Sequence, residues 1–172
     1  MSGGSVMPSK VQPERIYWDS CVVISCIEQT PNRYPALKTI IRDAQAGSLV
    51  LVVSTLVIAE VVKLNVSTES EQKQAKLIQD FFENDYIELR TIDRLTAELA
   101  AKISREYGLK PPDAIHTATA IRHECKCLQT YDGEQGCHSK LLAFDGKIGW
   151  PTLAIKLPED RQIVQQKNML PD

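Results

Sequence analysis

The segment Leu49–Val53 constrains the fold of this chain more than any other feature, because its five residues are all apolar and three are valine. An unbroken apolar run of this length is typical of a β-strand buried on both faces, as in the centre of a parallel sheet. Parallel strands need crossover connections, and helical patterns lie on both sides of this run. The sequence therefore predicts a parallel sheet covered by helices on both faces.

Strand-like and helix-like segments alternate along the rest of the chain. Four more strands are expected, at residues 15–18, 86–89, 127–131 and 151–155. Helices are expected between the strands, at residues 21–27, 35–46, 56–64, 67–83, 93–108 and 111–121. This order predicts an α/β fold, a three-layer α/β/α sandwich with a central, mostly parallel five-stranded sheet. In such sheets the functional site lies beyond the carboxyl ends of the strands.

The length of 172 residues fits one domain with short extensions at its ends. We expect a flexible lead over residues 1–14, one domain over 15–157 and a polar tail over 158–172. The first residues contain no apolar signal-peptide segment, and the longest nearly apolar stretch, Leu49–Ala59, is too short to span a bilayer. We therefore expect a cytoplasmic protein that does not associate with membranes.

Charge and motifs limit how this chain can bind phosphates. The formal net charge is -2, which argues against the strongly basic surface of a protein that binds nucleic acid through phosphates alone. Neither GxxxxGK[ST] nor GxGxxG occurs, so a glycine-rich phosphate loop is not supported. Any role in nucleic-acid chemistry must therefore use local charges or metal ions.

Four carboxylates stand where the predicted sheet and its helices are otherwise apolar. Two follow the strands at 15–18 and 127–131, one lies in an apolar helical tract, and one lies in the first turn of the helix at 111–121. They are, in chain order, Asp19, Glu60, Asp113 and Asp132. Carboxylates that share one edge of a sheet repel each other unless a cation or protons join them. Because oxygen ligands suit Mg²⁺ or Mn²⁺, the pattern predicts metal-assisted hydrolysis.

Each of these acids also has a simpler interpretation. Asp19 fits a helix N-cap, Asp113 fits the positive end of its helix, and Asp132 fits a turn before Gly133. Glu60 stands in the middle of its predicted helix, where only an orientation toward solvent would explain it. Four acids at the same edge are harder to explain in this way.

At these residues the sequence resembles the PIN-domain family, and within it the VapC-type toxin ribonucleases. The resemblance covers roughly residues 15–158, and the segment Gly108–Ala114 is its most specific part. The other segments that carry it are Tyr17–Ser20, Val53–Thr55, Ala59–Val61, Pro112–Ala118 and Thr130–Asp132.

The resemblance implies a divalent-metal-dependent endoribonuclease that hydrolyses single-stranded RNA, as the toxin of a toxin–antitoxin pair. It implies that Asp19, Glu60, Asp113 and Asp132 together are catalytic and bind Mg²⁺ or Mn²⁺, with Thr130 in support. It also implies a small antitoxin protein or a homodimer as partners. After Asp132 the chain departs from the family's pattern, and Asp145 is the alternative fourth acid.

Other interpretations remain open beside this one. The chain also fits a catalytically weak PIN-like module that binds RNA or protein. A receiver-like domain is disfavoured, because the adjacent acid pair and the lysine partner that it needs are missing. His116 lies on the same helical face as Asp113, and packing or a hydrogen bond explains it better than a role as a base.

Five residues with soft donor atoms suggest a zinc site: His123, Cys125, Cys127, Cys137 and His138. The spacing of Cys125 and Cys127 is not that of a zinc site, so we expect core cysteines whose side chains point to opposite faces. Trp150 fits either a residue that stacks on bases or a core residue.

Overall fold

The structure is a computed structural model and describes residues 12–62, 64, 70–134 and 140–162. One sheet contains five strands in the order β3-β2-β1-β4-β5, and every neighbouring pair is parallel. The strands are β1 (Glu14–Trp18), β2 (Leu49–Ser54), β3 (Ile87–Arg90), β4 (Cys127–Gln129) and β5 (Ala154–Lys156). The predicted α/β fold and its parallel five-stranded sheet are confirmed.

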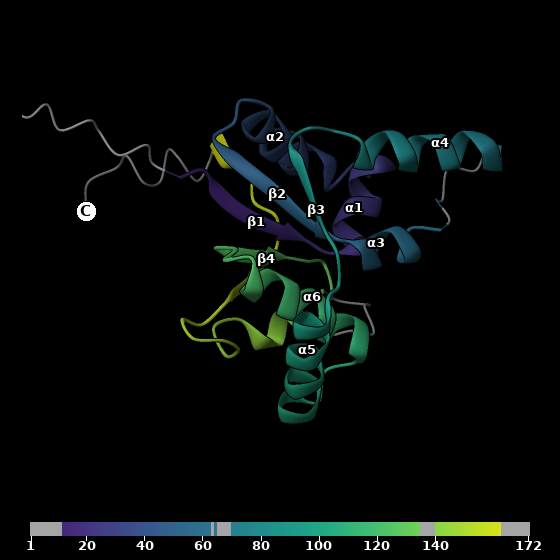
Figure 1. Ribbon diagram of the computed structural model, residues 1–172. Coiled ribbons are helices and arrows are strands. Elements are labelled where there is room, and N and C mark those ends of the chain that lie inside the picture. The colour runs from purple at the N-terminus through teal and green to yellow at the C-terminus, as the bar shows by residue number, and fades with distance from the viewer. Residues whose placement is uncertain (1–11, 63, 65–69, 135–139, 163–172) are drawn as a thin grey trace, which may run out of the picture.

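Helices cover both faces of this sheet, so the molecule has three layers (Figure 1). The helices α1, α2 and α4 lie on one side of the sheet, and α5 and α6 lie on the other (Figure 1). Their bounds, with those of the short α3 and of the 3₁₀ helix η1, are α1 (Ser20–Ile27), α2 (Tyr34–Gln45), α3 (Thr55–Glu60), α4 (Glu71–Phe82), α5 (Arg94–Tyr107), α6 (Pro111–Arg122) and η1 (Leu141–Phe144).

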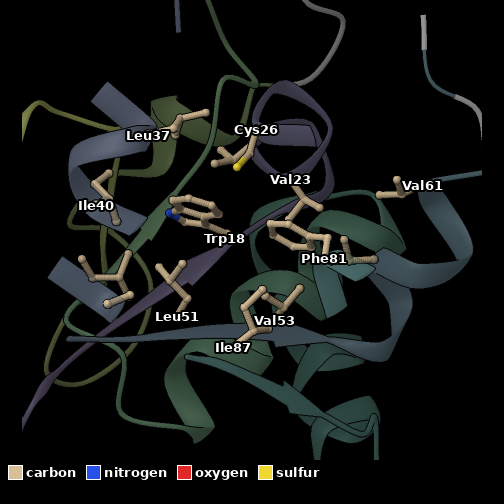
Figure 2. Close-up of a cluster of buried hydrophobic side chains, with 14 of the residues drawn as sticks. Trp18, Val23, Cys26, Leu37, Ile40, Leu51, Val53, Val61, Phe81 and Ile87 are labelled. Atoms are coloured by element: carbon tan, nitrogen blue, oxygen red, sulfur yellow. The ribbon is translucent and has the colours of Figure 1, made fainter. Parts of the chain in front are cut away.

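Two apolar cores fill the spaces between the layers, and alternation along the strands assigns residues to each core. In β1, Ile16 and Trp18 face the core under α1 and α2, whereas Tyr17 faces the core under α5 and α6. Figure 2 shows Trp18 in the first core, between helix residues such as Val23 and strand residues such as Leu51. Because both faces are covered, β2 is apolar from Leu49 to Val53, as its sequence predicts.

The order of the strands creates a topological switch point between β1 and β4. From β1 the chain adds β2 and β3 on one side, and later adds β4 and β5 on the other side. The crossover connections then leave β1 and β4 in opposite directions, and functional sites of parallel sheets lie beyond the carboxyl ends of the strands at such a point. Asp19 follows β1, and Asp132 comes three residues after β4, so both acids lie at this edge.

Several element bounds differ from those predicted. The helix expected at 56–64 ends at Glu60, because Val61 leaves the helical conformation with φ -85° and ψ 62°. Strand β4 ends at Gln129, β5 begins only at Ala154, and η1 was not predicted. Trp150 is 96% exposed, so its interpretation as a core residue is wrong.

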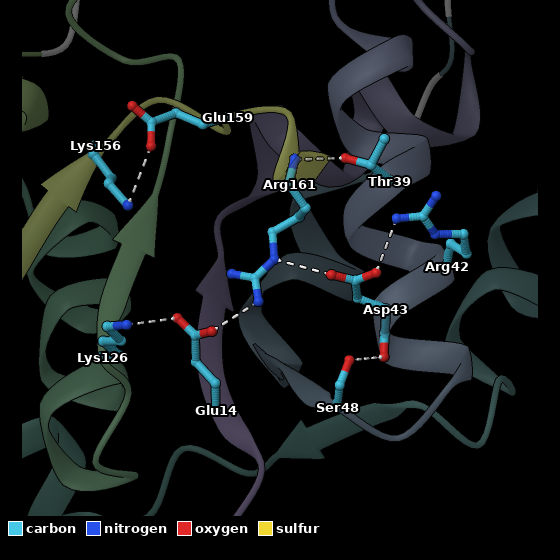
Figure 3. A network of polar contacts seen from close by, with 9 residues as sticks. All are labelled: Glu14, Thr39, Arg42, Asp43, Ser48, Lys126, Lys156, Glu159 and Arg161. Carbon is cyan, nitrogen blue, oxygen red and sulfur yellow. Dashed lines mark hydrogen bonds and ion pairs between the residues drawn. The ribbon is translucent and has the colours of Figure 1, made fainter. Parts of the chain in front are cut away.

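The segment after β5 brings Arg161 to the opposite, amino-terminal end of β1. There the Arg161 guanidinium donates to Glu14 at 2.9 Å and to Asp43 at 3.1 Å (Figure 3). Its backbone N–H donates to the Thr39 hydroxyl at 3.0 Å. Most of the expected lead and tail, residues 1–11 and 163–172, lies outside the described residues.

Within the described part of the chain, no helix is both long and apolar enough to cross a bilayer.

The buried position of β2 generates a stability prediction. The Leu51 side chain is fully buried in the first core, whereas Leu95 on α5 is 59% exposed. We expect Leu51→Ala to lower the free energy of unfolding by about 2–5 kcal/mol, because the truncation leaves a cavity. Leu95→Ala, the matched control, should change it much less. Urea denaturation of both variants measures the difference, and equal losses would contradict the assignment of β2 to the core.

Candidate active site

Asp19 is the most deeply buried acid at the carboxyl edge of the sheet, with 2% of its surface exposed. It is the N-cap of α1, and its side chain accepts a hydrogen bond from the backbone N–H of Val22 at 3.1 Å. The same oxygen, Oδ1, accepts from the Cys21 thiol at 2.9 Å. Burial raises the pKa of Asp19, and the electrostatic interaction with His116 together with these hydrogen bonds offsets part of the effect. The N-cap interpretation is therefore correct but incomplete.

Asp19, Cys21 and Asp132 form one tight group. Each offers one ligand atom, and these atoms all lie within 4.8 Å of one another. The loop that carries Asp132 is held in place at two points: the backbone N–H of Asp132 donates to the Thr130 hydroxyl at 2.9 Å, and the backbone N–H of Tyr131 donates to the Cys21 sulfur at 3.1 Å. Two distant segments of the chain therefore meet at this group.

Glu60 belongs to a second set of contacts at the same edge. Its Oε2 lies 2.9 Å from Nε2 of His116, and Nδ1 of His116 lies 2.8 Å from the Tyr17 hydroxyl. That hydroxyl donates to the Ser54 hydroxyl at 2.9 Å. The hydrogen-bond network Glu60–His116–Tyr17–Ser54 thus joins α3, α6, β1 and β2 through the buried interior.

This hydrogen-bond network controls the charge of Glu60, which is half-buried. Burial disfavours the ionised carboxylate, but hydrogen bonds from His116 and Ser20 and the electrostatic interaction with His116 outweigh this effect and hold the pKa of Glu60 below its usual value. Ser20 lies between Asp19 and Cys21 in the sequence, so it links Glu60 to the tight group. His116 is buried and hydrogen-bonded, as predicted.

Asp113 lies in the first turn of α6, as predicted, one turn before His116. Its backbone carbonyl accepts a hydrogen bond from the Thr117 hydroxyl at 2.8 Å. Among the described residues, the tight group contains two of the four predicted acids, and Glu60 and Asp113 are outside it. Glu60 is the last residue of α3, so the predicted position of Glu60 in the middle of a helix was wrong.

Asp145, the alternative fourth acid, has a different role in the fold. Its Oδ1 accepts a hydrogen bond from the backbone N–H of Ile155 in β5 at 2.8 Å. It therefore connects the end of η1 to β5, and it is not a member of the tight group.

Cys21 was not predicted as a site residue, because it belongs to the apolar helical pattern at residues 21–27. A residue two positions after an N-cap nevertheless lies in the same turn as the capping side chain. Two of the candidate zinc ligands are core residues, as expected: Cys127 packs in the first core and Cys125 in the second. Cys137 and His138, weighed with them, lie outside the described residues.

The donor set fits a divalent cation. Two carboxylates that face each other need a positive charge between them, and their oxygens suit Mg²⁺ or Mn²⁺. The thiol adds a soft donor, which favours metals such as Zn²⁺ or Cd²⁺. Burial and the neighbouring Asp19 carboxylate raise the pKa of the Cys21 thiol, which favours its protonated form.

Comparison with known proteins places the geometry in a family context. The family model of the PIN domain matches residues 16–136, a span that contains all four predicted acids. No curated protein sequence matches the chain.

Solved structures of toxin–antitoxin proteins share the fold. The DNA-bound VapBC of Salmonella typhimurium has a TM-score of 0.56 at 14% identity and covers 83% of this chain and 96% of its own. VapBC2 of Rickettsia felis, bound to a DNA fragment from its promoter, has a TM-score of 0.54 at 13% identity, covering 70% and 90%. VapC20 of Mycobacterium tuberculosis, a toxin described as cleaving the sarcin–ricin loop, has a TM-score of 0.54 at 15% identity, covering 69% and 91%. At these identities the similarity shows the fold alone.

The tight group generates a spectroscopic prediction. We expect Cd²⁺ to bind and to produce sulfur-to-metal charge-transfer absorption in the ultraviolet, because a thiolate ligates this soft ion. Cys21→Ser should remove the absorption. Cys26→Ser, which changes a core cysteine on the same helix, should keep it. An unchanged band in Cys21→Ser would contradict a cation site at this group.

Proposed function

This chain belongs to the PIN-domain family, and from that premise we propose that it is a divalent-metal-dependent endoribonuclease that hydrolyses single-stranded RNA as the toxin of a toxin–antitoxin pair. One observation carries the proposal: Asp19 and Asp132 converge at the switch point of the sheet, where a cation is needed to offset their repulsion. The proposed cofactor is Mg²⁺ or Mn²⁺.

Each acid has a distinct part in the proposed reaction. Asp19 and Asp132 would hold a divalent ion, which when bound would supply Lewis-acid chemistry to the phosphodiester and to water. Thr130 fixes the backbone at Asp132. Glu60, kept ionised and oriented by His116, orients the attacking water. Asp113 completes the acidic rim from the first turn of α6.

The proposed partner is a small antitoxin protein. The solved structures from Salmonella typhimurium and Rickettsia felis are both VapBC proteins, and this supports such a partner. In the proposal, the tail of the antitoxin fills the acidic site and blocks RNA. A homodimer through surface helices and a cytoplasmic location complete the proposal.

One observation favours a second candidate, a PIN-like module that binds RNA or protein with little turnover. Cys21 brings a protonated thiol into the donor group, where a hard ion such as Mg²⁺ prefers oxygen. Weak metal binding would leave the fold intact and slow the reaction. Mn²⁺ that raises the melting temperature without cleavage of any RNA would favour this candidate.

Asp19→Asn tests the nuclease proposal directly. Asparagine caps helices about as well as aspartate, so the variant should stay folded. It loses the buried negative charge, and we expect RNA cleavage in Mn²⁺ to be abolished and the Mn²⁺-induced rise in melting temperature to shrink. Both are measured on the purified protein.

Asp93→Asn is the matched control, because Asp93 caps α5 in the same way as Asp19 caps α1. This variant should cut RNA at the wild-type rate. Undiminished cleavage by folded Asp19→Asn protein would refute the role given to Asp19.

A further inference from the structure

Arg33 lies just before α2 and is held by three contacts. Its guanidinium carbon is 3.9 Å from the centroid of the Tyr131 ring. Nη1 donates to the Ser25 hydroxyl at 3.0 Å, and Nη2 donates to Glu134 at 2.8 Å. The side chains of Arg33 and Glu134 remain 31% and 35% exposed, so the ion pair is open to solvent.

These contacts attach Arg33 to both segments that carry the metal donors. The Ser25 hydroxyl donates to the backbone carbonyl of Cys21 at 2.8 Å. Tyr131 directly precedes Asp132, and its backbone N–H donates to the Cys21 sulfur. A fixed positive charge therefore borders the acidic group.

A polyanion that approaches this edge needs such a charge. The acids repel phosphates, and the chain as a whole carries a net charge of -2. Arginine suits this task because its planar fork of donors matches a phosphate, and a fork already ordered by stacking loses little freedom on binding. Ser25 and Tyr131 provide that order.

Glu134 accepts a hydrogen bond from Nη2 of Arg33, a donor that a phosphate could also use. An ion pair that is about one third exposed contributes little to stability, because water and salt screen it. An incoming phosphate can therefore replace the Glu134 carboxylate on Nη2 while the contacts to Ser25 and Tyr131 persist.

We propose that Arg33 binds a backbone phosphate of the RNA beside the scissile bond, and that Glu134 is an internal anion that competes for the same guanidinium. The proposal rests on the nuclease function proposed above. It makes Arg33 a substrate-binding residue and gives Arg33 and Glu134 opposite effects on RNA affinity.

The test measures the affinity for a short single-stranded RNA over a range of salt concentrations, in a non-cleaving Asp19→Asn background. Arg33→Ala should weaken binding roughly tenfold, as expected for a lost charge-assisted contact. It should also reduce the slope of log K against log salt by about 0.7, because one phosphate is no longer neutralised. Glu134→Gln should strengthen binding and keep the slope.

Arg42→Ala is the matched control, since Arg42 lies near the other end of α2 and also pairs with a carboxylate, Asp43. It should leave the affinity and the slope unchanged. In a background with Asp19 intact, Arg33→Ala should raise KM for RNA while kcat changes little. Thermal unfolding checks that each variant is folded. If Arg33→Ala does not fold, the RNA affinity of Glu134→Gln alone tests the proposal.

Two results would overturn the inference. The first concerns the inference alone. If the Asp19→Asn protein binds RNA but adding Glu134→Gln weakens binding, or if folded Arg33→Ala keeps the full slope of log K against log salt, Arg33 does not contact a phosphate, and the nuclease proposal stands. The second concerns both: if the Asp19→Asn protein does not bind RNA and the wild-type protein does not cut it, the proposed function fails and the inference fails with it.

Discussion

The repulsion between carboxylates at the end of the central strand is the constraint on which the rest of this site depends. Asp19 is buried, and an ionised group is costly in such an environment. A carboxylate oxygen of Asp132 lies within 4.8 Å of one of Asp19. The fold tolerates this arrangement through the N–H of Val22, the thiol of Cys21 and the electrostatic interaction with His116. These contacts offset the effect of burial only in part, and a divalent cation is the group that would complete the compensation.

Topology and hydrogen bonding together bring the acids to this point. The switch between β1 and β4 brings Asp19 and Asp132 to one edge of a sheet that is packed on both faces. The buried chain from Ser54 through Tyr17 and His116 then fixes Glu60, although Glu60 stands at the end of a short helix. A rigid network thus supports a site whose edge, at Arg33 and Glu134, remains open to solvent.

Much of this architecture could be predicted from the sequence, and the failures have physical reasons. The apolar run at β2 predicted a sheet covered on both faces. The acids that follow strands predicted the edge of the sheet at which Asp19 and Asp132 meet. The end of α3 was missed because Val61 and Val62 continue an apolar pattern although the backbone leaves the helix. The Arg161 contacts with Glu14 and Asp43 join residues that are distant in the chain, and no local pattern reports such pairs.

The sequence by itself determined the order in which strands and helices follow one another along the chain, because hydrophobic periodicity and capping residues act over a few positions. It also determined which acids stand at the ends of strands. Only the tertiary structure decided which side chains meet: Cys21 joins Asp19 and Asp132, while Asp145 binds β5 instead. The reason is that the crossing of α6 and the pairing of β1 with β4 set distances between residues that lie about a hundred positions apart.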